Sequence, residues 1–166
     1  MDYKIVNMQA SDWGQVSNIY WEGIQNKIST FQNTIPTWEE WDKGHCKSCR
    51  LVAKDGDIVL GWVALSPTSS RSVYAGVVDV SIYVGNSFKG KGVGRALLLE
   101  LIRESEIHGF WTLQSRIIKE NTASRELHKS LGFKEIGICE KLGKMDTGIW
   151  YDIVLAQRRS SVVGVD

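Results

Sequence analysis

One stretch of the chain decides its fold, and it reads Gly85-Asn86-Ser87-Phe88-Lys89-Gly90-Lys91-Gly92-Val93-Gly94-Arg95. The residues before it, Val77–Val84, are rich in β-branched side chains and alternate in polarity, which predicts a strand. The residues after it place apolar side chains at helical spacing as far as Ile102, and a helix that ends near Gly109 is expected. The stretch is therefore a glycine-rich turn between a strand and a helix.

The composition of this turn is typical of an anion site. The seven residues from Lys89 to Arg95 contain three glycines and three cations. Glycine lets the backbone approach a ligand closely, and a helix N-terminus adds partial positive charge to that of the side chains. We expect the turn to bind a pyrophosphate. The alternative is a plain turn whose lysines are only solvated.

Two common phosphate-binding patterns do not fit. A Walker A loop needs Ser or Thr after Lys91 to hold magnesium, and Gly92 stands there. A G-x-G-x-x-G dinucleotide pattern that begins at Gly92 needs glycine at position 97, which is Leu97. The turn therefore favours neither an ATPase nor a Rossmann enzyme.

The rest of the chain predicts an α/β (α+β) domain. Strands are expected over residues 3–7, 51–54, 58–65, 77–84, 111–118, 133–139 and 148–155. Helices are expected after Ser11-Asp12, from the capping box Thr37–Glu40, from Val93, and from Asn121 to Leu131. Because hairpins and helical crossovers both occur, we expect a mixed sheet of about seven strands flanked by about four helices.

Composition limits the partners. The chain has 166 residues, and its 20 Lys and Arg nearly balance its 19 Asp and Glu, which disfavours a nucleic-acid partner. No apolar run approaches the roughly 18 residues of a membrane span, so no membrane partner is expected. Three cysteines without a visible signal peptide predict a cytoplasmic protein with free thiols.

A pair of cysteines, Cys46 and Cys49, stands beside His45 and raises the question of zinc. A structural zinc site needs four ligands, usually from two such pairs. The remaining Cys139, His108 and His128 are scattered singly. We therefore expect no metal.

Two blocks of sequence resemble the GCN5-related N-acetyltransferase (GNAT) superfamily. The turn from Lys89 to Gly94 resembles its Gln/Arg-x-x-Gly-x-Gly/Ala turn, with Lys in the first position, and Asn121–Phe133 resembles its N-x-x-S-x-x-L-Y/H-x-x-x-G-F signature. Ser29–Phe31, Thr37–Trp41 and Met145–Asp152 look like one branch, the phosphinothricin / methionine sulfoximine N-acetyltransferases.

The resemblance runs from about Tyr3 to Gln157, so it implies one GNAT domain over residues 1–158, with a splayed sheet, and a polar tail over 159–166. It implies acetyl-CoA as cosubstrate. The residues that it assigns to the cofactor are Ile82, Tyr83, Val84, Lys89, Gly90, Lys91, Gly92, Val93, Gly94, Arg95, Asn121 and Ser124.

The resemblance also implies catalytic roles for Asp79 and His128. The family places an acid, usually Glu, at the position of Asp79, where it takes a proton from the amine directly or through a bridging water. An acid inside an apolar strand is costly unless it is used or paired, which independently favours a site. His128 stands where many relatives carry Tyr and would protonate the leaving thiolate. The alternative interpretation is that His128 only packs against its neighbours and has no catalytic role.

For the acceptor, the resemblance indicates the amino group of a small amino acid or analogue, which attacks acetyl-CoA directly without an acyl-enzyme. The residues expected to bind it are Phe31, Arg71, Ser72, Asp79, Val80 and Ser81, with Arg71 on a carboxylate. Two alternatives stay open: a different amine (polyamine, aminoglycoside or protein N-terminus), or a non-catalytic acyl-CoA-binding module. The family also implies a homodimer.

Overall fold

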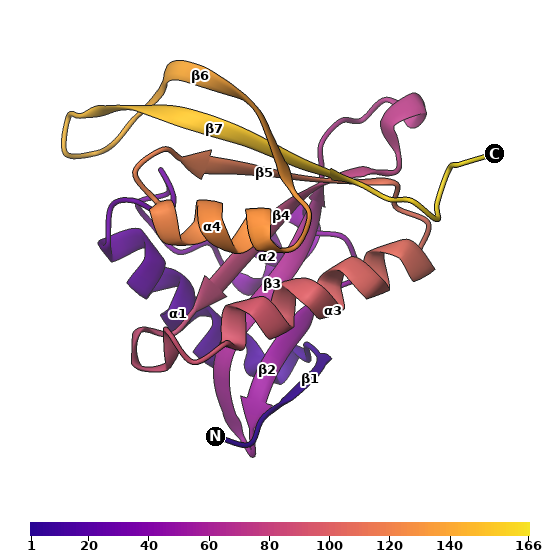
Figure 1. Cartoon of the computed structure of the whole chain (residues 1–166). Helices are drawn as coiled ribbons and strands as arrows, with labels where there is room; N and C mark the ends of the chain where they lie inside the picture. Colours follow the sequence, from indigo (N-terminus) through magenta and orange to yellow (C-terminus); the bar gives the residue numbers. More distant parts are fainter.

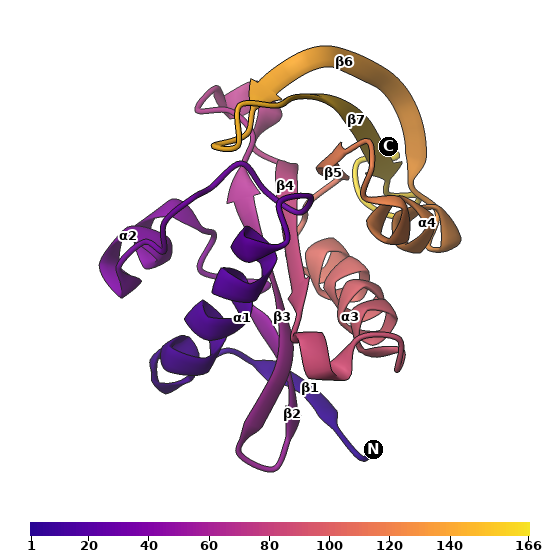
Figure 2. The same cartoon turned by 90° about the vertical axis from the view of Figure 1, so that its left-hand side faces the viewer.

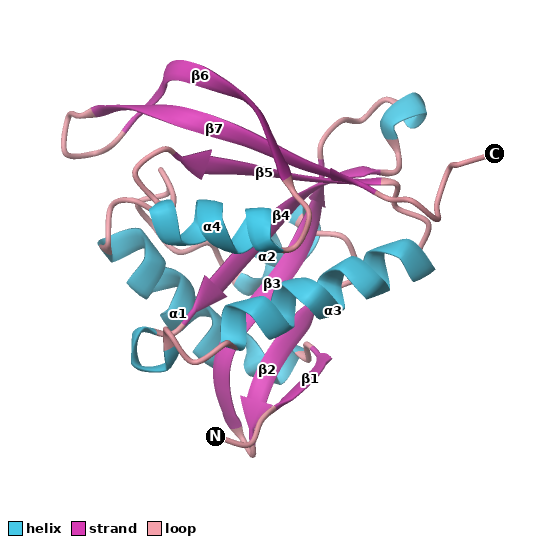
Figure 3. Cartoon of the chain, in the orientation of Figure 1, coloured by secondary structure: helices cyan, strands magenta, loops and turns pink.

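The computed structural model describes residues 1–166 and is built around a mixed sheet of seven strands (Figure 1). The strands are β1 (Lys4–Asn7), β2 (Leu51–Asp55), β3 (Ile58–Pro67), β4 (Val77–Val84), β5 (Thr112–Ile118), β6 (Lys134–Lys144) and β7 (Trp150–Arg159). The helices are α1 (Trp13–Gln25), α2 (Trp38–Gly44), α3 (Val93–Ile107) and α4 (Thr122–Ser130), shown in cyan in Figure 3. The strand order is β1-β2-β3-β4-β5-β7-β6, which confirms the predicted fold class.

The sheet splits between β4 and β5. These two strands are parallel, and they pair only at Val77 with Thr112, Val78 with Leu113, and Asp79 with Gln114. All other neighbouring strands are antiparallel. Beyond the last pair the two strands diverge, as Figure 1 shows, so their carboxyl-terminal halves leave a gap. This is the splay that the sequence resemblance implied.

The two faces of the sheet carry different layers. Figure 2 shows α1 and α2 on one side of β2–β4 and α3 on the other. On the α3 side the main core packs Val78, Leu113 and Ile117 against the helix, together with the partly buried Val80. Side chains alternate along a strand. Asp79, Ser81 and Tyr83 therefore point to the opposite face, where Tyr83 packs among the aromatic side chains beside α1.

Several local signals act as predicted. The Thr37 hydroxyl accepts a hydrogen bond from the Glu40 N–H, and the Glu40 carboxylate accepts one from the Thr37 N–H, so the capping box starts α2. The side chain of Asn121 caps α4, and Gly132 follows that helix with φ of 90°. These are short-range effects, which is why the sequence predicts them.

The closing hairpin and the tail differ from expectation. β6 and β7 extend to Lys144 and Arg159, several residues beyond the strands predicted there. The end of β6 pairs with β7 across irregularities in register, and the end of β7 pairs with β5. The guanidinium of Arg159 donates to the carbonyls of Ser160, Val163 and Gly164, which ties down the chain after β7. No helix has the length and apolarity that crossing a membrane requires.

Candidate active site

A cavity of about 870 Å³ fills the gap between β4 and β5. On each of these strands, residues that point to either face of the sheet line the cavity: Ser81 and Ile82 on β4, and Ser115 and Arg116 on β5. The cavity is therefore open to both faces of the sheet. Of the residues expected to bind the cofactor, the lining includes Ile82, Tyr83, Val84, Lys89, Gly90, Gly92, Val93, Gly94, Arg95, Asn121 and Ser124.

The glycine-rich turn forms the end of the cavity at the start of α3. Gly92 caps the helix with φ of 81°, a left-handed conformation that favours glycine, and it has no side chain to bond the free N–H groups of the first turn. A Cβ added at Gly90 or Gly92 would meet no protein atom within 4 Å. The backbone of the turn is therefore open to a ligand at these two positions. Lys91 does not line the cavity; its Nζ donates to the Ser87 carbonyl over 3.2 Å.

On the α3 side, His128 of α4 reaches Ser115 of β5. The His128 Nε2 lies 2.8 Å from the Ser115 Oγ, and its Nδ1 lies 2.7 Å from the Ser124 carbonyl oxygen. Both side chains are almost fully buried, yet both residues line the cavity. Burial lowers the pKa of His128, and the bond to the Ser124 carbonyl offsets this only in part, so the imidazole is neutral near pH 7.

On the opposite face, Asp79 is held at the point where the strands part. Gln114 donates from Nε2 to the Asp79 carboxylate over 3.2 Å, and Gln157 donates to the Gln114 carbonyl over 2.7 Å. Asp79 itself does not line the cavity, whereas Val80 and Ser81 do. A carboxylate in this position reaches a ligand in the cavity through a bridging water more readily than directly.

The end of the cavity near Asp79's face is closed by the loop after α1 and by the β6–β7 hairpin. Phe31 from the loop packs so closely on Gly143 of β6 that an added Cβ there would lie 2.5 Å from its ring. Both residues line the cavity. Lys27 and Asp146 form an ion pair of 2.8 Å that joins the same two segments. Phe31 thus lies in the wall of the cavity, and its contact with the acceptor stays a prediction.

Arg71 and Ser72, in contrast, are exposed and do not line the cavity. The Arg71 guanidinium lies 5.5 Å from the centre of the Tyr74 ring. The arginine that does line this end is Arg116 of β5, which shares the face of Gln114 and forms no ion pair. Sequence reasoning missed it because a single Arg in a strand gives no signal until the splay of the sheet is known.

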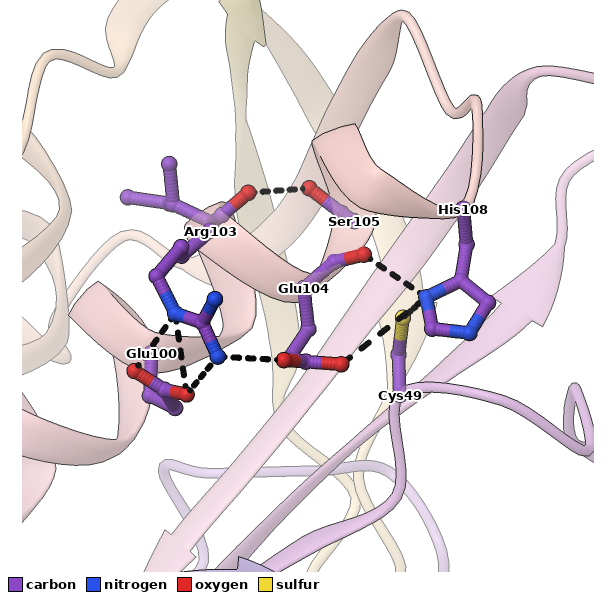
Figure 4. A network of polar contacts seen from close by, with 7 residues as sticks. Cys49, Glu100, Arg103, Glu104, Ser105 and His108 are labelled. Atoms are coloured by element: carbon purple, nitrogen blue, oxygen red, sulfur yellow. Dashed lines mark hydrogen bonds and ion pairs between the residues drawn. The ribbon is translucent and has the colours of Figure 1, made fainter.

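Cys49 of the cysteine pair lines a separate, smaller cavity of about 550 Å³, and Cys46 does not. Cys49 Sγ lies 3.8 Å from His108 Nδ1, which also lies 2.9 Å from the Glu104 carbonyl oxygen, as Figure 4 shows. Burial raises the pKa of the Cys49 thiol to about 11, so the thiol is protonated and unreactive. No group of three or more His, Cys, Asp or Glu side chains is arranged to hold a metal ion.

Comparison with known proteins agrees with this geometry. Residues 13–133 match the acetyltransferase (GNAT) family. The phosphinothricin N-acetyltransferase of Alcaligenes faecalis is 36% identical over 155 residues, which cover 89% of this chain and 77% of that protein. The L-methionine sulfoximine/L-methionine sulfone acetyltransferase of Salmonella typhimurium is 33% identical over 107 residues, or 64% and 62% of the two chains.

A solved structure shows the same fold. The phosphinothricin acetyltransferase of Sinorhizobium meliloti, in complex with acetyl-CoA, superposes with a TM-score of 0.88 at 28% identity. The match covers 100% of this chain and 92% of that one.

Proposed function

This chain belongs to the acetyltransferase (GNAT) family and is an acetyl-CoA-dependent N-acetyltransferase, and on that premise we propose that its acceptor is the amino group of a small amino acid or analogue. The acids named for its relatives, phosphinothricin and methionine sulfoximine, are of this type. Each combines an amine with a carboxylate.

The charge of the cavity is the observation that carries the proposal. Its lining contains Lys89 and Arg95 near the glycine-rich turn and Arg116 at the other end, but no Asp or Glu. The first two cations suit the phosphates of acetyl-CoA. Arg116 is left to bind the carboxylate of the acceptor with two parallel hydrogen bonds. A polyamine or an aminoglycoside would meet no carboxylate in the lining, so these acceptors are disfavoured.

The acceptor and the cofactor then have different places relative to the sheet. The acceptor enters on the face of Asp79 and Arg116, and Asp79 takes a proton from its ammonium group through water, which leaves a neutral amine able to attack. Backbone groups of β4 and the turn position the thioester in the gap. A binding module without catalysis would have no use for a carboxylate held at this point.

An acceptor screen tests the function. Purified protein with acetyl-CoA should release free CoA in the presence of methionine sulfoximine, phosphinothricin or methionine sulfone, and much more slowly with spermidine, an aminoglycoside or a peptide N-terminus. Faster turnover of a polycation than of every amino acid would contradict the proposal. Binding of CoA by calorimetry without turnover of any amine would favour the non-catalytic alternative.

Arg116→Gln should raise the KM for an amino acid acceptor about tenfold or more, because a hydrogen bond between charged groups is worth about 1.5–3 kcal/mol. The KM for acetyl-CoA should stay within twofold. Arg71→Gln is the matched control, since Arg71 lies outside the cavity. If Arg71→Gln raises the acceptor KM and Arg116→Gln does not, the carboxylate site is the one that the sequence resemblance implied.

We also propose that the protein is a cytoplasmic homodimer, with no nucleic-acid or membrane partner. β6 is an edge strand of the sheet. Five large apolar side chains of the β6–β7 hairpin are more than half exposed: Ile136, Ile138, Leu142, Ile149 and Trp150. A second copy that packs on this hairpin would cover some of them. Analytical ultracentrifugation should give a dimer that dissociates in Ile138→Asp. A monomeric wild-type protein at micromolar concentration would overturn this proposal.

A further inference from the structure

We propose that Ser115 is a catalytic residue of the acetyl transfer and that His128 acts through it as a buried proton relay. The inference rests on the N-acetyltransferase function proposed above. It concerns the proton that must reach the sulfur atom when CoA leaves.

The hydrogen bonds of His128 fix the direction of the relay. A carbonyl oxygen can only accept, so the 2.7 Å contact with Ser124 places the ring proton on Nδ1. Nε2 is then unprotonated and accepts the hydroxyl proton of Ser115 over 2.8 Å. Both ring nitrogens are engaged, so His128 reaches a ligand only through the Ser115 hydroxyl.

The fold places that hydroxyl in the wall of the cavity. Ser115 follows Gln114, the last residue of β5 that pairs with β4, and lines the cavity at the start of the gap. By alternation it points to the face of α3 and α4, opposite to Asp79. The attacking nitrogen and the leaving sulfur are bonded to the same carbon in the tetrahedral adduct, and one hydroxyl at the gap can reach both.

The relay balances every proton. After the neutral amine attacks, the adduct nitrogen is positively charged and must lose one proton, while the sulfur must gain one. Ser115 Oγ takes the proton from nitrogen as its own proton passes to His128 Nε2, which gives an imidazolium. The C–S bond then breaks with its electron pair on sulfur, Ser115 gives a proton to that sulfur, and Nε2 returns one to Ser115. No other reactant is consumed.

The surroundings of His128 suit a transient proton carrier. Its ring contacts Ser115, Ser124 and the edge-on ring of Phe133 at 4.8 Å, and no charged side chain acts on its pKa. The neutral form is therefore the resting state, and the imidazolium gives its proton back readily. The Ser124 carbonyl accepts from Nδ1 in both forms, so the ring need not turn.

Kinetics of single and double variants test the relay. Ser115→Ala and His128→Gln should each lower kcat about a hundredfold, in the range of general acid–base catalysis, with little change in the KM for acetyl-CoA. If the two residues act as one unit, the double variant should be no slower than either single one. Ser115→Thr keeps the hydroxyl and should restore most of the rate. Multiplicative losses in the double variant, or a Ser115→Ala enzyme near the wild-type rate, would overturn the relay.

A second measurement does not depend on turnover. In the free protein, 15N NMR of the imidazole ring should show neutral His128 with its proton on Nδ1. Ser115→Ala should change the chemical shift of Nε2. The melting temperature of the variant shows whether it is still folded. A proton on Nε2 would contradict the proposed direction even if the variants unfold. If instead the wild-type protein acetylates no amino acid, the function proposed above fails, and the NMR result still decides the pairing.

Discussion

Asp79→Ala is expected to lower kcat with an amino acid acceptor about a thousandfold, within the range known for general base catalysis, and to leave the Kd of acetyl-CoA unchanged. The cavity lining contains no carboxylate, so no acidic group there can replace Asp79 as the base. Asp79 lies at the last β4–β5 pair and away from the glycine-rich turn. The substitution should therefore leave the affinity for acetyl-CoA unchanged. Stopped-flow release of CoA and calorimetric titration of acetyl-CoA measure the two quantities.

Asp79→Asn is the matched control for structure. Its side-chain carbonyl can still accept the hydrogen bond from Gln114, so the polar chain to Gln157 survives while the base is lost. Both variants should regain rate as pH rises, because a larger fraction of the acceptor amine is then neutral without help. If Asp79→Asn keeps the wild-type rate at neutral pH, the role of Asp79 is structural and water alone removes the proton.

Much of this fold could be predicted from the sequence, because the signals are local. The strand–turn–helix around Gly92 and the capping box at Thr37 depend on residues within a few positions of one another. The full length of β6 could not be predicted, since it depends on pairing with β7 across a bulged register. An irregular ladder leaves no strict alternation to detect.

In the site, too, local features could be predicted from the sequence and long-range ones could not. Most residues of the glycine-rich turn line the cavity, because a turn places consecutive positions together, but Lys91 does not. Ser115 and Arg116 were missed because they line the cavity only where β5 leaves β4, and that depends on which strands pair. Arg71 was expected to bind the acceptor, yet the loop that carries it leads away from the cavity. A motif thus predicts which consecutive residues lie together at a cavity, whereas side chains contributed across the sheet need the topology.

Gly92→Val should weaken acetyl-CoA binding a hundredfold or more, since two charge-assisted hydrogen bonds from the turn, each worth about 1.5–3 kcal/mol, would be lost or lengthened. A valine side chain would occupy the open space in front of the amides and strain the left-handed backbone at φ of 81°. Gly109, at the other end of α3, is a matched control: its φ is also 81°, and an added Cβ there also meets nothing within 4 Å.

Because the two glycines share conformation and free space, Gly92→Val and Gly109→Val should lose similar stability, about 1–2 kcal/mol or somewhat more for a β-branched side chain. Only Gly92→Val should change the Kd of acetyl-CoA, because Gly109 does not line the cavity. Chemical denaturation measures the first quantity and calorimetry the second. Equal losses of affinity in both variants would mean that binding responds to the stability of α3, whereas a loss confined to Gly92→Val assigns it to the amides at the start of that helix.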